Sequence, residues 1–132
     1  MIEVNTEEKD TKPRTRMVNF KRRRYPRFNV DLTIEYYRTN SSISHSGRVM
    51  NASEDGSLIY FPERVKIGER LKLKLFFILG SATNIIGPLA EVVWMDFHLD
   101  ETWGDYRSGV KFIDITQEDL NRLKNFFKSL SL

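Results

Sequence analysis

An alternation of apolar and polar residues over residues 28–36 constrains the fold of this chain most strongly. The apolar positions fall on every second residue, and they are Phe28, Val30, Leu32, Ile34 and Tyr36. The residues between them are polar, namely Asn29, Asp31, Thr33 and Glu35. Because successive side chains of a strand point to opposite faces, this period of two predicts a β-strand with one buried face.

Shorter segments with the same character follow, separated by residues that favour turns. Five further strands are expected, over residues 47–50, 57–61, 71–75, 89–97 and 109–113. Gly68 marks one of the intervening turns, and residues 80–84 are expected to form a loop. Six short antiparallel strands with regular turns are typical of a small barrel or sandwich.

The hydrophobic period changes near the end of the chain and predicts a helix. Thr116 can cap the helix, and Asp119 three residues later resembles the second half of a capping box. The apolar residues that recur at helical spacing are Leu120, Leu123, Phe126, Phe127 and Leu130. The expected fold class is therefore all-β with one C-terminal amphipathic helix.

The positive charge of the chain is concentrated before the first strand. Residues 1–27 hold nine Lys or Arg against four Asp or Glu, whereas residues 28–132 hold twelve against fourteen. The densest part is the stretch from Lys21 to Arg27, in which five of seven residues are basic. We therefore expect any bound anion to contact this stretch. Residues 1–20 are polar without periodicity and are expected to be a flexible leader to a domain over residues 21–132.

The composition argues against several other functions. The chain has no cysteine, which excludes disulfides and thiolate sites and suits a reducing cytoplasm. His45 and His98 lie far apart without neighbouring metal ligands, and the glycine-rich motifs of nucleotide-processing enzymes are missing. The most apolar run, residues 75–79, is too short to cross a bilayer. We expect a cytoplasmic binding protein with no membrane span, no metal, no cofactor and no catalysis.

Two arginines in the basic stretch have a spacing suited to binding. Arg23 and Arg27 lie four residues apart, just before the first expected strand. The planar guanidinium group pairs with phosphate oxygens, with the edge of guanine, or with the face of a purine. Basic proteins contain this spacing often by chance, so it indicates a site only in combination with a second signal.

A turn-forming stretch over residues 51–56 provides the second signal. Asn51 and Ser53 place an amide and a hydroxyl two residues apart, where both can hydrogen-bond the edge of a ligand. Gly56 permits unusual backbone angles or a close approach. On its own this pattern is also that of an ordinary turn stabilised by its side chains.

The two stretches resemble the motifs of the PilZ domain family of bacterial cyclic di-GMP receptors. Their order and separation are similar to those of the family, and so are the barrel strands and the C-terminal helix expected after them. The motif residues are Arg23, Arg27, Asn51, Ser53 and Gly56, and residues 109–112 also look like the last barrel strand of the family. The resemblance covers residues 21–130. It implies a six-stranded antiparallel β-barrel that binds cyclic di-GMP, with the arginines on phosphates and guanines and the turn residues on a guanine.

The resemblance also suggests roles for two further residues. Arg22 precedes the first motif arginine, and in the family a basic residue there goes with binding an intercalated pair of ligand molecules. Trp94 is a candidate for an aromatic wall beside the ligand, or alternatively for a place in the barrel core. Only one of Trp94 and Val93 is expected to face outward, because neighbouring strand residues face opposite ways.

Two alternatives to a cyclic di-GMP receptor with a downstream protein partner remain. A small β-barrel with a basic arm could bind single-stranded nucleic acid, although the strand aromatics mostly fall on the apolar faces. The chain could also be a PilZ domain that acts only as an interaction module, without ligand.

Overall fold

The computed structural model describes residues 25–97 and 106–130. Its elements, in chain order, are β1 (Phe28–Arg38), β2 (Ser44–Ala52), β3 (Gly56–Phe61), β4 (Arg70–Leu79), β5 (Ala82–Ile86), β6 (Leu89–Phe97), β7 (Tyr106–Asp114) and α1 (Gln117–Leu130). The strands form one sheet in the order β1-β2-β3-β7-β6-β4-β5, and every pairing is antiparallel.

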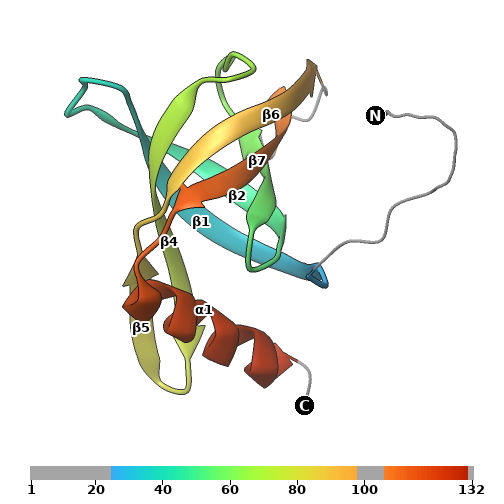
Figure 1. The fold of residues 1–132 in the computed structure, drawn as a ribbon, viewed down its shortest axis with the longest axis vertical. Coiled ribbons are helices and arrows are strands. Elements are labelled where there is room, and N and C mark those ends of the chain that lie inside the picture. Colours follow the sequence, from blue (N-terminus) through green and yellow to red (C-terminus); the bar gives the residue numbers. More distant parts are fainter. Residues whose placement is uncertain (1–24, 98–105, 131–132) are drawn as a thin grey trace, which may run out of the picture.

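A pairing between β1 and β4 closes this sheet into a barrel. Residues 34–38 of β1 pair with residues 71–75 of β4, so the ring comprises β1, β2, β3, β7, β6 and β4. Strand β5 pairs with the end of β4 and lies outside the ring, beside α1 (Figure 1). The predicted six-stranded antiparallel barrel with one C-terminal helix is confirmed.

The expectation of a loop over residues 80–84 was wrong. Strand β4 continues to Leu79 and β5 begins at Ala82, which leaves a tight turn at Gly80 and Ser81. Gly80 has a φ of 65°, a conformation that glycine adopts without a steric cost. Most of β5 is exposed and lacks regular alternation, so its strand character comes from pairing with β4 rather than from its own pattern.

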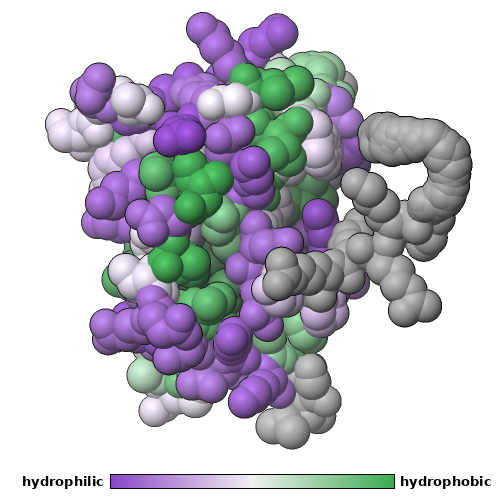
Figure 2. Space-filling view, viewed as in Figure 1, coloured by the Kyte–Doolittle hydropathy of each residue, from purple (hydrophilic) through white to green (hydrophobic). Residues whose placement is uncertain are grey.

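The interior of the barrel is filled by the inward side chains of its strands. Ile34 and Tyr36 of β1 are fully buried, as the alternation predicted, and Phe28, Val30 and Leu32 are partly buried against the core. On the face seen in Figure 2, hydrophobic side chains form a broken band among hydrophilic ones. The apolar side of each strand therefore faces the core, while polar residues occupy much of the outside.

Helix α1 begins with the predicted cap and packs on the chain's own strands. The Asp119 N–H donates to the Thr116 hydroxyl at 3.1 Å, whereas the Asp119 carboxylate accepts from the Gly87 N–H at 2.9 Å. Phe127 stacks on Phe28 with ring centroids 4.6 Å apart. Phe126 and Phe77 make a second ring contact, so the helix covers the open end of the core beside β4 and β5. Leu130, expected in the apolar stripe, is 44% exposed at the end of the helix.

A buried tyrosine allows a first test of this packing. The Tyr36 hydroxyl donates to Glu63 at 2.8 Å. Burial raises the pKa of Tyr36, and the same hydrogen bond lowers the pKa of Glu63. Replacing Tyr36 with phenylalanine is expected to lower the free energy of unfolding by about 1 kcal/mol at neutral pH, measured by urea denaturation. Because the carboxyl pKa is depressed in the folded state, this difference should diminish as the pH falls through that pKa.

Tyr37 provides the matched control for this substitution. It lies next to Tyr36 but faces outward, and its hydroxyl makes no hydrogen bond among the described residues. Tyr37→Phe is therefore expected to leave the free energy of unfolding nearly unchanged. Equal effects of the two substitutions at pH 7 would contradict a stabilising role for the Tyr36–Glu63 bond.

Candidate ligand-binding site

The structure places five of the seven predicted site residues. Arg22 and Arg23 lie outside the described residues, and the five described ones are Arg27, Asn51, Ser53, Gly56 and Trp94. They come from the segment before β1, from β2 and the turn that follows it, from the start of β3, and from β6. The site is therefore built on the outside of the barrel, across several strands.

Arg27 and Asn51 connect the two stretches that the sequence separates. The Arg27 guanidinium donates through Nη1 to Oδ1 of Asn51 at 3.3 Å. Arg27 directly precedes β1, while Asn51 lies on β2 opposite Asn29, so the antiparallel pairing of these strands brings them together. Arg27 is exposed and Asn51 is half-buried. A guanidinium and an amide thus meet at the surface, where both can reach a ligand.

Ser53 begins the turn between β2 and β3, and its hydroxyl is engaged within that turn. It is 1% exposed, and it donates to Oδ1 of Asp55 at 2.6 Å. The Ser53 N–H donates to the Gly56 carbonyl at 2.8 Å, which closes the turn. Donation by this hydroxyl to a ligand requires it to leave Asp55, and its burial limits access, so Ser53 in this conformation primarily shapes the turn.

Gly56 is required for a different reason than an unusual backbone angle. Its φ is not in the left-handed region, but a Cβ at this position would overlap the carbonyl oxygen of Val110 on β7. The same Cβ would lie 3.3 Å from the Cα of Lys111. The glycine therefore lets β3 approach β7 closely at the start of their pairing.

Trp94 lies outside the core, on the same face as Asn51. A row of paired residues crosses four strands, from Asn51 through Leu58 and Gly109 to Trp94. A β-bulge between Val92 and Trp94 shifts the register, and Val93 and Trp94 are 43% and 37% exposed. The expectation that only one of these two residues faces outward was wrong, because a bulge interrupts the simple alternation.

The Trp94 indole lies over the backbone of Gly109, its partner on β7. A Cβ on Gly109 would overlap the indole, with Cε2 only 2.6 Å away. The guanidinium of Arg107 lies 5.9 Å from the centroid of the ring. Glycine on β7 therefore allows the aromatic ring to lie flat against the sheet and present its other face outward.

This arrangement predicts that Gly109→Ala displaces the indole of Trp94. Because the ring is partly exposed and can rotate away, the cost in the free energy of unfolding should stay below about 1 kcal/mol. Tryptophan fluorescence in a Trp103→Phe background should shift to longer wavelength as the ring becomes more hydrated. An unchanged spectrum would contradict the close packing of indole and glycine.

A second row of paired strand residues on the same outer face includes charged residues that the sequence motifs do not indicate. Arg48, Tyr60 and Arg107 are paired across β2, β3 and β7. Arg48 forms an ion pair with Asp31, and Arg107 with Asp96 at 2.9 Å. The hydrogen bonds that Arg107 donates to Asp96 raise the pKa of Arg107. Only the strand register shows that these residues lie near Asn51 and Trp94, since no sequence spacing connects them.

Other kinds of site find no support in the described part of the chain. No group of three or more histidine, aspartate or glutamate residues in residues 25–97 and 106–130 could hold a metal ion. Among those residues, no helix is long and apolar enough to cross a membrane.

Solved structures share this fold at low sequence identity. The PilZ domain of YcgR from Escherichia coli with c-di-GMP has a TM-score of 0.65 and 14% identity, covering 84% of this chain and 92% of its own. The Bacillus subtilis inhibitor of motility (MotI/DgrA) has a TM-score of 0.67 and 17% identity over 85% of this chain. The MrkH–c-di-GMP complex of K. pneumonia has a TM-score of 0.63 and 18% identity over 84%.

The chain spans about half the length of the latter two proteins, 53% and 52% respectively. The comparison with curated proteins found no match. The fold and the arrangement of the site define a small antiparallel barrel with polar and aromatic groups gathered on its outer face. The family model for the PilZ domain matches residues 21–129, and the chain belongs to the PilZ domain family.

Proposed function

We propose that this protein is a cytoplasmic receptor for cyclic di-GMP, and that it binds and signals rather than catalyses. The observation that carries the proposal is the hydrogen bond between Arg27 and Asn51, which joins the two motif stretches at one place on the barrel surface. Trp94 continues the row of Asn51 across the sheet. YcgR and MrkH, whose structures hold c-di-GMP, support this choice of ligand through their shared fold.

Each group has a role in binding cyclic di-GMP. Arg27 pairs with a phosphate or with the O6 and N7 atoms of a guanine, in concert with Arg23. Asn51 accepts and donates at a guanine edge, Ser53 contributes its hydroxyl after a rearrangement of the turn that exposes it, and Gly56 keeps β3 against β7. The face of Trp94 stacks on a base. Arg22 favours the binding of two intercalated ligand molecules.

Ligand binding then changes the surface offered to a partner. The basic residues of the stretch from Lys21 to Arg27 repel one another, and two ligand phosphates neutralise them. The domain over residues 21–132 thereby gains a defined surface, which a downstream protein reads in the control of motility, biofilm or polysaccharide. Equal amide exchange over residues 11–27 with and without saturating cyclic di-GMP would contradict this ordering.

Isothermal titration of the full chain with cyclic di-GMP tests the ligand assignment directly. We expect saturable binding, with a stoichiometry of two if the intercalated pair forms, and no comparable heat from GMP. A titration without binding at protein and ligand concentrations well above the micromolar range would overturn the proposal.

One structural observation favours a second candidate function, the binding of single-stranded nucleic acid. Trp94 is exposed on the outer face with the Arg107 guanidinium 5.9 Å from its ring. Base stacking on an aromatic ring beside a cation is typical of such binders. Titration with a short oligothymidine separates the two functions, since a cyclic di-GMP receptor should bind it only weakly and with a steep salt dependence.

A further inference from the structure

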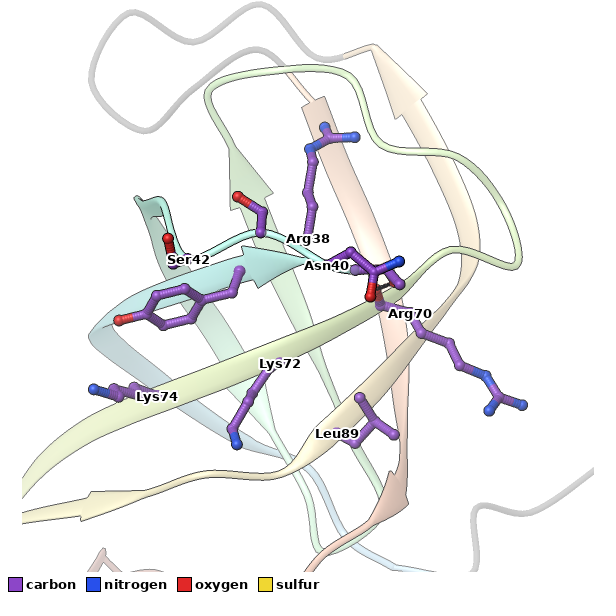
Figure 3. Close-up of a pocket in the computed structure, with 10 residues that line it drawn as sticks. Arg38, Asn40, Ser42, Arg70, Lys72, Lys74 and Leu89 are labelled. Carbon is purple, nitrogen blue, oxygen red and sulfur yellow. Dashed lines mark hydrogen bonds between the residues drawn. The ribbon is translucent and has the colours of Figure 1, made fainter.

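A surface pocket lies on a different side of the barrel from the candidate site described above. It has a volume of about 730 Å³ and is formed where the end of β1, the loop that follows it, and β4 meet (Figure 3). The candidate cyclic di-GMP site crosses the outer faces of β2, β3, β7 and β6, whereas this pocket lies over β1 and β4. The two surfaces use different strands.

The pocket is basic because of the alternation along β4. Leu71, Leu73 and Leu75 are buried in the core, so the residues between them point outward. Lys72 is paired with Tyr37 of β1 on one side and with Leu89 of β6 on the other. The ammonium group of Lys74 lies 5.6 Å from the Tyr37 ring centroid. Two lysines, an aromatic ring and a leucine therefore share one surface.

Lys72 and Lys74 remain available to an acidic ligand, although Glu35 lies opposite Lys74 on β1. Neither forms an ion pair within residues 25–97 and 106–130. Other cations near the pocket differ, because Arg38 pairs with Glu69 at 2.9 Å and Arg70 lies 3.6 Å from Glu91. Figure 3 shows the side chains of Lys72 and Lys74 on one side, with the head groups of Arg38 and Arg70 directed away from them.

We propose that this pocket binds an extended acidic segment of a partner protein. Lys72 and Lys74 are two residues apart on a strand, so their Cα atoms are separated by about 6.8 Å. Two carboxylates separated by one residue in an extended peptide have the same spacing and can each meet one lysine. The residue flanking such a pair can cover Tyr37 or Leu89. This inference rests on the proposed receptor function, which requires a partner that reads the ligand state.

The charges around the pocket favour a short acidic segment over a nucleic acid. Glu35 lies opposite Lys74 on β1, and Asp114 lies opposite Leu89 on β7. Glu91 accompanies Arg70 at a third border. A polynucleotide needs a continuous positive track for its phosphates, and these three carboxylates would repel it. A peptide with only two or three acids fits between them.

A peptide titration followed by amide NMR of the full chain tests the proposal. The peptide is a serine heptapeptide that carries glutamates at its third and fifth positions. We expect shifts at residues 70–74, at Tyr37 and at Leu89, and binding that weakens as salt is raised. K72E/K74E and the milder K72Q/K74Q should each lower the affinity about tenfold or more. The control K66E/K128E makes the same change in net charge at exposed lysines elsewhere and should keep the affinity.

Three outcomes would overturn the proposal. One is an affinity unchanged in both Lys72/Lys74 double variants, and another is peptide shifts confined to residues 21–27. The third is an oligothymidine that binds this pocket more tightly than the peptide does. Calorimetry with cyclic di-GMP distinguishes the two sites, because K72E/K74E is expected to bind this ligand as the unmodified protein does. A loss of peptide binding alone supports the pocket over β1 and β4, whether or not cyclic di-GMP proves to be the ligand of the first site.

Discussion

Replacing Arg27 with alanine is expected to weaken cyclic di-GMP binding by between about tenfold and a hundredfold. A hydrogen bond to a charged group contributes about 1.5–3 kcal/mol, and each 1.4 kcal/mol corresponds to a factor of ten in affinity. Arg27 is an exposed side chain that precedes β1, and removal of an exposed side chain usually costs little stability. The stability of the barrel should therefore stay nearly constant while affinity falls, as measured by calorimetry and urea denaturation.

Arg64 provides the matched control for Arg27. It is an exposed arginine in the connection between β3 and β4, away from the row of Asn51 and Trp94. Arg64→Ala removes the same charge and is expected to change affinity less than twofold. If the two substitutions weaken binding equally, the arginine acts through net charge alone and the specific contact is refuted. Asn51→Ala should also weaken binding, and a non-additive double variant would show that the two residues act together.

Gly56→Ala is expected to lower the free energy of unfolding by about 3 kcal/mol. The added methyl group would overlap the carbonyl oxygen of Val110, which belongs to paired backbone, and the methyl group itself is attached directly to the paired backbone of β3. To remove this overlap, β3 and β7 must separate where their pairing begins. The expected loss in the free energy of unfolding is therefore at the upper end of what overpacked substitutions cost. Urea denaturation measures the loss, and cyclic di-GMP affinity should fall with it because the turn from Ser53 to Gly56 is displaced.

Gly87 is the appropriate control for Gly56. An added Cβ there would meet only the Leu73 carbonyl oxygen at 3.6 Å, an ordinary contact. Gly87→Ala should change the free energy of unfolding by less than about 0.5 kcal/mol, or stabilise the protein slightly by restricting the unfolded chain. A Gly56→Ala protein as stable as Gly87→Ala would show that the two strands have room for a side chain.

Much of this fold could be predicted because its signals are local. The alternation over β1 and the cap at Thr116 both depend on residues close in sequence, and the structure confirms them. Strand β5 could not be predicted, because its exposed residues form a strand only through pairing with β4. Local periodicity cannot show a strand that depends on its neighbour.

The sequence predicts residues for the candidate site but not their geometry. The motif spacing selected Arg27 and Asn51, yet only the pairing of β1 with β2 brings their side chains within 3.3 Å. The outward direction of Trp94 depends on a bulge, and the need for Gly56 depends on a strand that lies more than fifty positions later. Contacts of this kind follow from the register of the sheet, which the amino-acid order does not display.

The ring stack between Phe127 and Phe28 attaches the first residue of β1 to helix α1. Phe28 is the residue immediately after Arg27, and its ring is held against helix α1 with centroids 4.6 Å apart. Glu54, in the turn beside Asn51, is also tied to the helix through Lys124 at 3.9 Å. The start of β1 and the turn after β2 are therefore both fixed to helix α1. Helix α1 thereby holds the two neighbours of the Arg27–Asn51 pair, Phe28 and Glu54, at one end of the barrel.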